Sequence, residues 1–381
     1  MRICSPHCGL DPETTSGGET YERELLQRLA MRGTAIDIIL ARHKRYPEGV
    51  PNWFVHRLRM GRGLRWPVAA VVFPPAIRRV YEATRFDVLR AHSLRYVAPA
   101  ALIERRRYAL DVPVIAHHHH LDPGRLNPLI EGQVMRRVDR VVVGSEFARR
   151  QAGQELGVPQ EQFSVVHYGV DRRFRPGPKS DALVRRLGLV GGPVALFVGG
   201  LKTRKNLFFL LDAWREVVRE RPDARLVIAG SGPLRGRLER YVGRLGLRDR
   251  VVLTGYVPEN EKVAYYNLAD VLLFPSSLEG FGLTVVEAMS CELPVVVSDR
   301  GSLPELVPDG HGGFLCEPSL RGGFVERTLL LLSDPALRRK FGVTNRERVD
   351  RMFRWEHCVE ATTRVYEEVL DGWRHRRAPS R

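Results

Sequence analysis

Two glutamates eight positions apart, Glu279 and Glu287, frame a glycine turn in the stretch Pro275-Ser-Ser-Leu-Glu-Gly-Phe-Gly-Leu-Thr-Val-Val-Glu. The apolar run Val271–Pro275 before the turn is typical of a strand, and the residues after it are typical of a helix. If the helix begins near Gly282, its first backbone N–H groups lie at the carboxyl edge of a sheet, where they can bind a phosphate. Glu287, about one turn further along, can reach a sugar hydroxyl. The alternative is a surface loop with solvated glutamates.

A second group of chemically capable residues is the histidine run that follows the strand-like segment Val112–Ala116. Side chains of a strand alternate between its faces, so His117 and His119 share one side and His118 and His120 the other. Only one of these pairs can line a site. A metal site is an alternative, although neighbouring strand residues rarely converge on one ion without ligands from elsewhere.

These residues need elements to position them, and short β-rich apolar runs alternate with longer amphipathic segments almost from end to end. This alternation is typical of parallel sheets flanked by helices, so we expect an α/β protein. The clearest helix is Thr20–Met31, where apolar residues recur at helical spacing. The strand candidates are Ala35–Leu40, Val112–Ala116, Val141–Gly144, Phe163–Val166, Val194–Gly199, Leu226–Gly230, Val251–Gly255, Val271–Pro275 and Pro294–Ser298.

The length of 381 residues predicts two or three domains, and the hydrophobic content of 44% supplies ample material for their cores. Prolines and a glycine in the segment 172–180 interrupt both periodicities, so the chain should divide near residue 175. After residue 352 the segment Trp355–Val369 is typical of a helix, and the polar tail from Trp373 should be frayed. The expected domains are residues 1–174, 175–352 and, as a terminal helix with its tail, 353–381.

The chain carries 60 basic residues, only six of them Lys, against 44 acidic residues, which gives a formal net charge of +16. Such a surplus attracts phosphates, nucleic acid or anionic lipid whatever the fold. Residues 51–100 hold nine Arg but only two acidic residues, and aromatic residues interleave with them at Trp53, Phe54, Trp66, Phe73 and Tyr81. Two interpretations stay open: a solvated arginine-rich face, and a surface for an anionic membrane or a lipid-diphosphate acceptor.

The sequence contains no apolar stretch of 18 residues, and its N-terminus lacks the apolar core of a signal peptide. We therefore expect a cytoplasmic protein whose contact with a membrane, if any, is peripheral and at the inner face.

The glutamate pair belongs to an ordered series of motifs that covers nearly the whole chain. The other members are Phe197–Asn206, Ile228–Pro233, Thr254–Val257 and Ser298–Val307. In order and spacing this series resembles the GT-B retaining glycosyltransferases of family 4, which include bacterial mannosyl-, glucosyl- and N-acetylglucosaminyltransferases. The resemblance implies two Rossmann-like, doubly wound parallel-sheet domains facing a cleft, with a nucleotide-diphosphate sugar held by the second domain. It also implies that the last helix returns to the N-terminal domain.

The resemblance implies roles for residues of the second domain. Glu287 would bind the ribose hydroxyls, Lys205 the diphosphate, and the amides of Leu283 and Thr284 the phosphates. Fixed cations and helix N–H groups suit this task, because negative charge develops on the diphosphate as the glycosidic bond breaks. The other donor-binding candidates are Gly199, Arg204, Gly230, Tyr256, Val257, Glu279, Gly280, Phe281 and Gly282.

One departure from the family pattern concerns the cations of this site. Many members carry an arginine where this chain has Gly200. Arg204 or Lys202 would then supply the second positive charge toward the diphosphate.

In the first domain, the loop containing Gly17 and Gly18 precedes an amphipathic helix and matches the family's glycine loop, which faces donor phosphates and acceptor. The family places a functional histidine six positions after Pro113, which is His119 here. Tyr168 stands where the family usually has Asn, in a turn whose Gly169 and Asp171 we interpret as structural. Because asparagine tolerates left-handed backbone angles better than tyrosine does, we expect a different local geometry there.

The resemblance implies a retaining hexosyltransferase, active in processes such as polysaccharide biosynthesis, in which the leaving phosphate helps to deprotonate the acceptor. His119, Glu279 and Lys205 would be its catalytic residues, positioning rather than attacking. No two Asp residues lie two positions apart, so the Asp-x-Asp metal signature is absent and we expect no metal or other cofactor. The donor would be a UDP-sugar or GDP-mannose, and the acceptor a hydroxyl of a glycan, a lipid-linked molecule or a small metabolite.

Two alternatives remain: a sugar-nucleotide 2-epimerase of the same fold, and a basic nucleic-acid-binding protein. The second lacks any recognition motif, so no nucleic-acid partner is expected.

Overall fold

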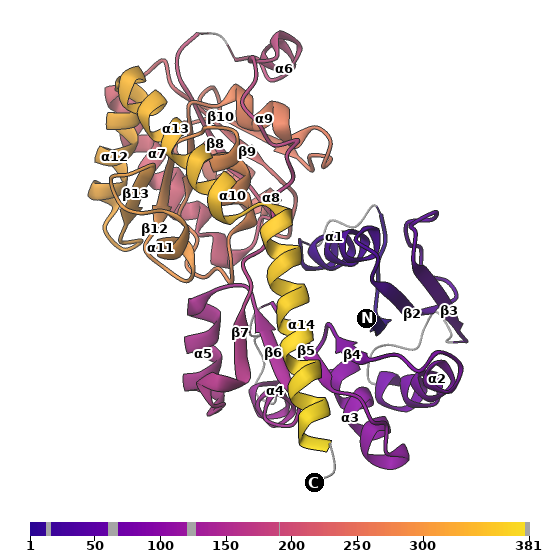
Figure 1. Ribbon diagram of the computed structural model, residues 1–381. Helices are drawn as coiled ribbons and strands as arrows, with labels where there is room; N and C mark the ends of the chain where they lie inside the picture. The colour runs from indigo at the N-terminus through magenta and orange to yellow at the C-terminus, as the bar shows by residue number, and fades with distance from the viewer. Residues whose placement is uncertain (13–16, 60–67, 120–126, 190, 378–381) are drawn as a thin grey trace. The chain divides into compact units, whose positions relative to one another are not determined.

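The structure is a computed structural model that describes residues 1–12, 17–59, 68–119, 127–189 and 191–377 (Figure 1). The chain divides into two compact units. The N-terminal unit comprises Met1–Tyr168 together with Trp355–Arg381, and the C-terminal unit comprises Gly169–Arg354.

Within the described residues, the N-terminal unit holds a seven-stranded parallel sheet of order β3-β2-β1-β4-β5-β6-β7. Its strands are β1 (Arg2–His7), β2 (Ala35–Ala41), β3 (Trp53–Leu58), β4 (Val88–Ala91), β5 (Val114–His118), β6 (Arg140–Val143) and β7 (Phe163–Val165). Its helices are α1 (Gly17–Met31), α2 (Ala69–Thr84), α3 (Val97–Tyr108), α4 (Asn127–Met135), α5 (Glu146–Leu156) and α14 (Trp355–Arg377), with a 3-10 turn η2 (Gln160–Gln162). The central strands are buried along their whole length, as expected for a parallel sheet covered on both faces.

The described part of the C-terminal unit holds a six-stranded parallel sheet of order β10-β9-β8-β11-β12-β13. Its strands are β8 (Val194–Val198), β9 (Arg225–Ala229), β10 (Val251–Gly255), β11 (Val271–Phe274), β12 (Val295–Ser298) and β13 (Gly313–Cys316). Its helices are α6 (Asp181–Arg186), the 3-10 turn η3 (Thr203–Lys205), α7 (Leu207–Glu220), α8 (Arg235–Arg244), α9 (Lys262–Leu268), α10 (Leu283–Ser290), α11 (Leu303–Leu306), α12 (Arg321–Ser333) and α13 (Pro335–Met352). Both sheets are doubly wound, because strand order reverses between β1 and β4 and again between β8 and β11.

The boundaries between the units differ from the predicted ones. The first boundary follows Tyr168 and not residue 174, and the second follows Arg354 and not residue 352. Both displaced segments pack in the C-terminal unit. Val170 donates its N–H to the carbonyl of Phe353 at 2.7 Å, and the hydroxyl of Ser290 in α10 donates to the carbonyl of Phe174 at 2.6 Å.

The helix α14 corrects a second expectation. It continues to Arg377, so the tail predicted to fray from Trp373 is helical for most of its length. The indole N–H of Trp373 donates to the Asp111 carboxylate at 3.0 Å, and Arg374 pairs with Asp87 at 3.2 Å. These contacts fasten the end of the helix to the N-terminal sheet unit, in which Figure 1 shows α14 in yellow.

The strands β1, β3, β4 and β13 are absent from the predicted set. β4 has only four residues and contains Arg90, and β1 contains Arg2 and Pro6, so neither shows an apolar strand pattern. The charged side chains of these two strands, Arg90 and Arg2, pair with carboxylates of other elements, Glu22 in α1 and Asp37 in β2.

The arginine-rich region 51–100 is also less uniform than its composition indicates. Arg90 and Phe73 are buried in the N-terminal unit, whereas Phe54 is 43% exposed. Trp66 and two of the arginines fall outside the described residues. In the described part of the chain, no helix combines the length and the apolar character needed to cross a bilayer.

Candidate active site

The predicted phosphate-binding turn lies at the carboxyl edge of the C-terminal sheet, after β11. Helix α10 begins at Leu283, and Gly282 precedes it with a φ of 96°. Within the helix, Val285 N–H donates to the carbonyl of Gly282 at 2.9 Å, so the N–H groups of Leu283 and Thr284 belong to the open N-terminal turn. A Cβ atom at position 282 would lie 3.0 Å from the Leu303 side chain, so both the backbone angle and the packing favour glycine here.

The segment after β12 packs against the backbone of this turn. Ser302 donates its hydroxyl to the carbonyls of Glu279 at 3.1 Å and Phe281 at 2.8 Å. Gly301, with a φ of 64°, passes so close that a Cβ atom there would lie 2.6 Å from the Glu279 carbonyl. The motif Ser298–Val307 therefore holds the backbone of the turn in place.

Three donors converge on one oxygen of Glu279, the first glutamate of the pair. Lys205 Nζ lies 2.5 Å, Arg204 Nη1 2.7 Å and Ser276 Oγ 2.6 Å from Glu279 Oε1. Lys205 and Arg204 reach it from η3, the short turn that follows β8, and Ser276 and Glu279 both follow β11. Lys205 and Glu279, which were predicted separately, thus meet at the point where strand order reverses, which is where doubly wound sheets bind ligands.

Burial and neighbouring charges shift the pKa values of Glu279 and Lys205. Burial acts to raise the pKa of Glu279, but the cations of Lys205 and Arg204 outweigh it and hold that pKa below its usual range. Burial lowers the pKa of Lys205, although Glu279 opposes the shift. The Lys205 ammonium also lies 4.4 Å from the centre of the Phe274 ring. A fixed, water-poor ammonium of this kind is suited to stabilise a developing anion.

Glu287, the second glutamate of the pair, has a separate set of partners. It lies on α10, and the hydroxyl of Tyr266 donates to its Oε2 at 2.7 Å. Lys262 Nζ lies 3.9 Å from its Oε1. Burial raises the pKa of Glu287, and the ammonium of Lys262 offsets only part of that shift.

Two predicted glycines allow the ends of neighbouring strands to approach each other. Gly199 follows β8 and Gly230 follows β9, with φ angles of 151° and 155°. A Cβ atom on Gly230 would lie 1.9 Å from the Gly199 carbonyl oxygen, so no side chain fits there. At Gly200, by contrast, a Cβ atom would have ordinary contacts of 3.8 Å or more, the nearest being with Lys202. The missing family arginine is therefore not explained by lack of space at its Cβ.

The remaining predicted donor residues lie beside these elements. Tyr256 and Val257 follow β10; Tyr256 is half-exposed and Val257 is buried. Phe281 is buried, with its ring 5.9 Å from that of Phe353. Gly280 lies between Glu279 and Phe281 in the turn itself.

The predicted residues of the first domain form a second site in the N-terminal unit. Gly17 and Gly18 are the first residues of α1, which begins three residues earlier than predicted. His119 follows β5, its Nε2 lies 2.9 Å from Glu22 Oε1, and its Nδ1 lies 2.5 Å from the Tyr168 hydroxyl.

Glu22, which the sequence analysis missed, is the centre of this second site. The two terminal nitrogens of the Arg90 guanidinium, Nη1 and Nη2, donate to its carboxylate at 2.5 and 2.9 Å. Burial acts to raise the pKa of Glu22, but Arg90 and His119 hold that pKa well below its usual range. The one signal in the sequence is spacing: Glu22 lies four residues after Gly18, on the same face of the helix.

The histidine run divides as the alternation of a strand predicts. His117 Nε2 lies 2.6 Å from the hydroxyl of Tyr366, which also accepts a bond from Arg90 Nε at 2.9 Å. His117 and His119 therefore join one buried network around Arg90. His120 falls outside the described residues. Among the residues that are described, no group of three or more His, Cys, Asp or Glu side chains could hold a metal ion.

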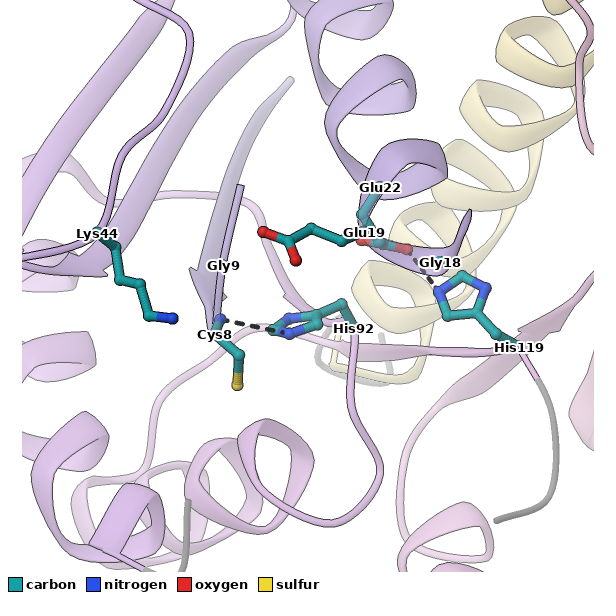
Figure 2. Close-up of a pocket in the computed structure, with 8 residues that line it drawn as sticks. All are labelled: Cys8, Gly9, Gly18, Glu19, Glu22, Lys44, His92 and His119. Atoms are coloured by element: carbon teal, nitrogen blue, oxygen red, sulfur yellow. Dashed lines mark hydrogen bonds and ion pairs between the residues drawn. The ribbon is translucent and has the colours of Figure 1, made fainter. Parts of the chain in front are cut away.

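A cavity of about 250 Å³ opens beside this network at the carboxyl ends of β1, β2, β4 and β5. Figure 2 shows Glu19 and Lys44 pointing toward the same space, with His92 and His119 on its other sides. The cavity is lined by Cys8, Gly9, Gly18, Glu19, Glu22, Lys44, His92 and His119. Because strand order reverses between β1 and β4, it occupies the ligand-binding position of the N-terminal sheet.

Two doubly wound units, each with polar residues gathered where its strand order reverses, have the architecture of the GT-B fold. Comparison with known families agrees: residues 15–174 match the family model Glycosyltransferase Family 4, and residues 181–348 match Glycosyl transferases group 1. The chain is 30% identical to D-inositol 3-phosphate glycosyltransferase of Acidothermus cellulolyticus, over 96% of this chain and 87% of that protein. The protein belongs to glycosyltransferase family 4, a family of retaining enzymes, and transfers a sugar from a nucleotide-sugar donor to an acceptor.

One further relative and one solved structure are also similar to this chain. The GDP-mannose-dependent alpha-(1-6)-phosphatidylinositol monomannoside mannosyltransferase of Mycolicibacterium smegmatis is 31% identical over 65% of this chain and 69% of its own length. The Anabaena protein HepE, solved with UDP and glucose, has a TM-score of 0.80 and 19% identity over 96% of this chain and 99% of its own. The predicted family and the two-unit α/β fold are confirmed.

Proposed function

We propose that the C-terminal unit binds a nucleotide-diphosphate hexose at the N-terminus of α10, and that the enzyme is a hexosyltransferase. The observation that carries this proposal is the convergence of Lys205, Arg204 and Glu279 beside the Gly282 turn. In this arrangement Lys205 and the amides of Leu283 and Thr284 bind the diphosphate, and Glu279 binds hydroxyls of the hexose. The bonds from Lys205, Arg204 and Ser276 all go to Oε1 of Glu279, so a sugar hydroxyl would bind through Oε2.

The same proposal assigns the nucleoside. Glu287 binds the ribose hydroxyls, and the base rests on the backbone near Tyr256 and Val257. The bond from Tyr266 and the ammonium of Lys262 hold the buried carboxylate of Glu287 in place for that task.

A thermal-shift panel of UDP, GDP, ADP and their hexose conjugates tests donor binding. A ligand at 100 times its dissociation constant stabilises the protein by about 2.7 kcal/mol, which is easily measured. We expect nucleotides of one base to raise the melting temperature clearly. Lys205→Met should weaken this shift, whereas Lys340→Met, at an exposed position on α13, should leave it unchanged. If no nucleotide stabilises the wild type, the donor site is not where we place it.

We further propose that the cavity of the N-terminal unit receives the acceptor hydroxyl. Its lining combines a carboxylate, Glu19, with an ammonium, Lys44, and it adjoins His119. Such a lining suits a hydroxylated, polar acceptor. Assays with inositol phosphates, hydroxy acids, amino sugars and phosphatidylinositol mannosides, each paired with the identified donor, would name the acceptor class.

The reaction is proposed to retain anomeric configuration without a metal ion. The carboxylates near the donor are held by cations and hydroxyls, which suits positioning rather than nucleophilic attack. Activity should persist in excess EDTA, and proton NMR of the product should show the anomeric configuration of the donor. Release of nucleotide diphosphate only when acceptor is present would separate transfer from 2-epimerisation.

The arginine-rich region, residues 51–100, is the part of the chain that could contact an anionic membrane. Within this region the apolar side chains of Phe54 and Val71 are exposed, and so are Arg57 and Arg79. Sedimentation with anionic and with neutral vesicles distinguishes the two interpretations of this region. Salt-sensitive binding to the anionic vesicles alone would favour a peripheral location at an anionic membrane, and no binding would favour a solvated face.

A further inference from the structure

The side chain of Tyr168, which stands where the family usually has Asn, is directed into the N-terminal unit. It is buried, and its hydroxyl lies 2.5 Å from His119 Nδ1. Its ring stacks on Tyr21, with centroids 3.9 Å apart and planes at 23°. On another side the ring lies against Gly144, where a Cβ atom would be 2.7 Å from Tyr168 Cε1. The ring of Tyr168 therefore packs between Tyr21 and Gly144.

The backbone accommodates this residue without the left-handed conformation that an asparagine would tolerate. Tyr168 is absent from the described non-glycine residues with positive φ. From this backbone position the side chain of Tyr168 reaches His119.

The protonation states of the neighbours define the direction of each hydrogen bond. Burial raises the pKa of the Tyr168 hydroxyl well above its usual value, so it carries its proton at neutral pH. Glu22 is ionised beside Arg90 and can only accept, so His119 must donate to it from Nε2. In the tautomer with its proton on Nε2, the imidazole has a lone pair on Nδ1 that can accept the Tyr168 O–H.

We propose that Tyr168 is a positioning residue for His119, whose ring it holds in one orientation and in the Nε2–H tautomer. The proposal rests on the proposed function, in which His119 lines the cavity that receives the acceptor hydroxyl. Both ring nitrogens of His119 are hydrogen-bonded to protein groups. The imidazole therefore lines the cavity in a fixed orientation and does not act as a base that exchanges protons with the substrate.

Tyr168→Phe tests this role, because it removes the hydroxyl while keeping the ring, its stacking on Tyr21 and its seat at Gly144. We expect kcat to fall roughly tenfold or more, because the ring of His119 is free to turn over. KM for the donor should stay within about twofold, because the proposed donor contacts belong to the C-terminal unit. Tyr241→Phe, which removes a hydroxyl bonded to Asp212 in the C-terminal unit, is the matched control and should leave kcat unchanged.

A measurement without substrate separates this proposal from the proposed function. In protein labelled with ¹⁵N-histidine, His119 should show a protonated Nε2 and an unprotonated Nδ1, and Tyr168→Phe should shift the Nδ1 resonance. A wild-type spectrum with the proton on Nδ1, or an unchanged kcat in Tyr168→Phe, would overturn the proposal. Gly144→Ala, which keeps the hydroxyl but displaces the ring, should reproduce the loss of kcat and serves if Tyr168→Phe does not fold. Absence of transfer by the wild type with every donor and acceptor would instead count against the proposed function.

Discussion

Arg90 and Glu22 form a buried, two-pronged ion pair in the N-terminal unit, with Nη1–Oε2 and Nη2–Oε1 distances of 2.5 and 2.9 Å. Arg90 is fully buried and Glu22 is 2% exposed. Tyr366, from α14 at the other end of the chain, accepts a bond from Arg90 Nε, and His119 donates to Glu22. One ion pair therefore links β4, α1, α14 and the residue that we place beside the substrate.

Removal of one partner of this pair should destabilise the N-terminal unit strongly. Glu22→Gln leaves the Arg90 charge buried without its counter-charge, and we expect a loss of about 3–5 kcal/mol. Glu24→Gln on the same helix, where the pair with Arg28 is partly exposed at 3.3 Å, should cost less than about 1 kcal/mol. Urea unfolding followed by tryptophan fluorescence measures both, because four of the five tryptophans belong to the N-terminal unit. Equal losses would show that the ion pair does not hold the unit together.

Lys205→Met should damage turnover far more than folding. The buried ammonium is a preorganised cation, and loss of one such group costs about 100-fold to 1000-fold in kcat. Steady-state kinetics with the identified donor, alongside a melting curve, would show this. Lys340→Met on the exposed face of α13 is the control. A folded Lys205→Met enzyme with kcat within twofold of the wild type would contradict the assigned role.

Gly282→Ala should weaken donor binding as well as stability. The residue has a φ of 96°, and an added Cβ atom would press on Leu303 at 3.0 Å, so the turn that carries the phosphate site must move. Gly246→Ala is matched in backbone angle, with a φ of 70°, but nothing lies within 4 Å of the added atom. It should cost only the left-handed strain of about 1–2 kcal/mol and leave donor affinity intact. Isothermal titration of both variants distinguishes them, and equal donor affinities would argue against a phosphate site at this turn.

Acid should destabilise the N-terminal unit before its carboxylates are affected. Burial lowers the pKa of His92 to about 4 and lowers the pKa of His7 and His117 well below the usual histidine value. The unfolded chain takes up protons below about pH 6.5 while the folded unit does not, so stability falls as pH drops from about 6.5 toward 4. Each histidine contributes a slope of at most about 1.4 kcal/mol per pH unit. Stabilisation by Glu22, whose pKa is lowered, is lost only at lower pH, below its unfolded value of about 4.3.

Urea midpoints between pH 7 and pH 4 measure this slope. His92→Gln should reduce it, whereas His311→Gln, at an exposed position of the C-terminal unit, should leave it unchanged. A flat profile over this range would mean that the buried histidines are protonated in the folded state.

The sequence by itself determined the alternation of strands and helices and the turn at Gly282, and its motifs, through the family that they resemble, determined Glu279, Lys205 and His119 as candidates. Those signals are local: the apolar period of each segment, the glycine before a helix and the fixed spacing of a motif all lie within a few residues. The predicted strands and the helix start at Leu283 agree with the structure for that reason.

The tertiary structure alone decided which of these residues have partners. Arg90 is 68 positions from Glu22, and Tyr168 is 49 positions from His119, so no local pattern joins them. The cavity brings together Lys44, His92 and His119, which follow three different strands. The hydrophobic periodicity of a strand does not predict its place in the sheet, so the sequence could not show that these residues meet. A buried charge such as Arg90 is tolerated only where another element brings its counter-charge, and that meeting depends on the packing of the whole unit.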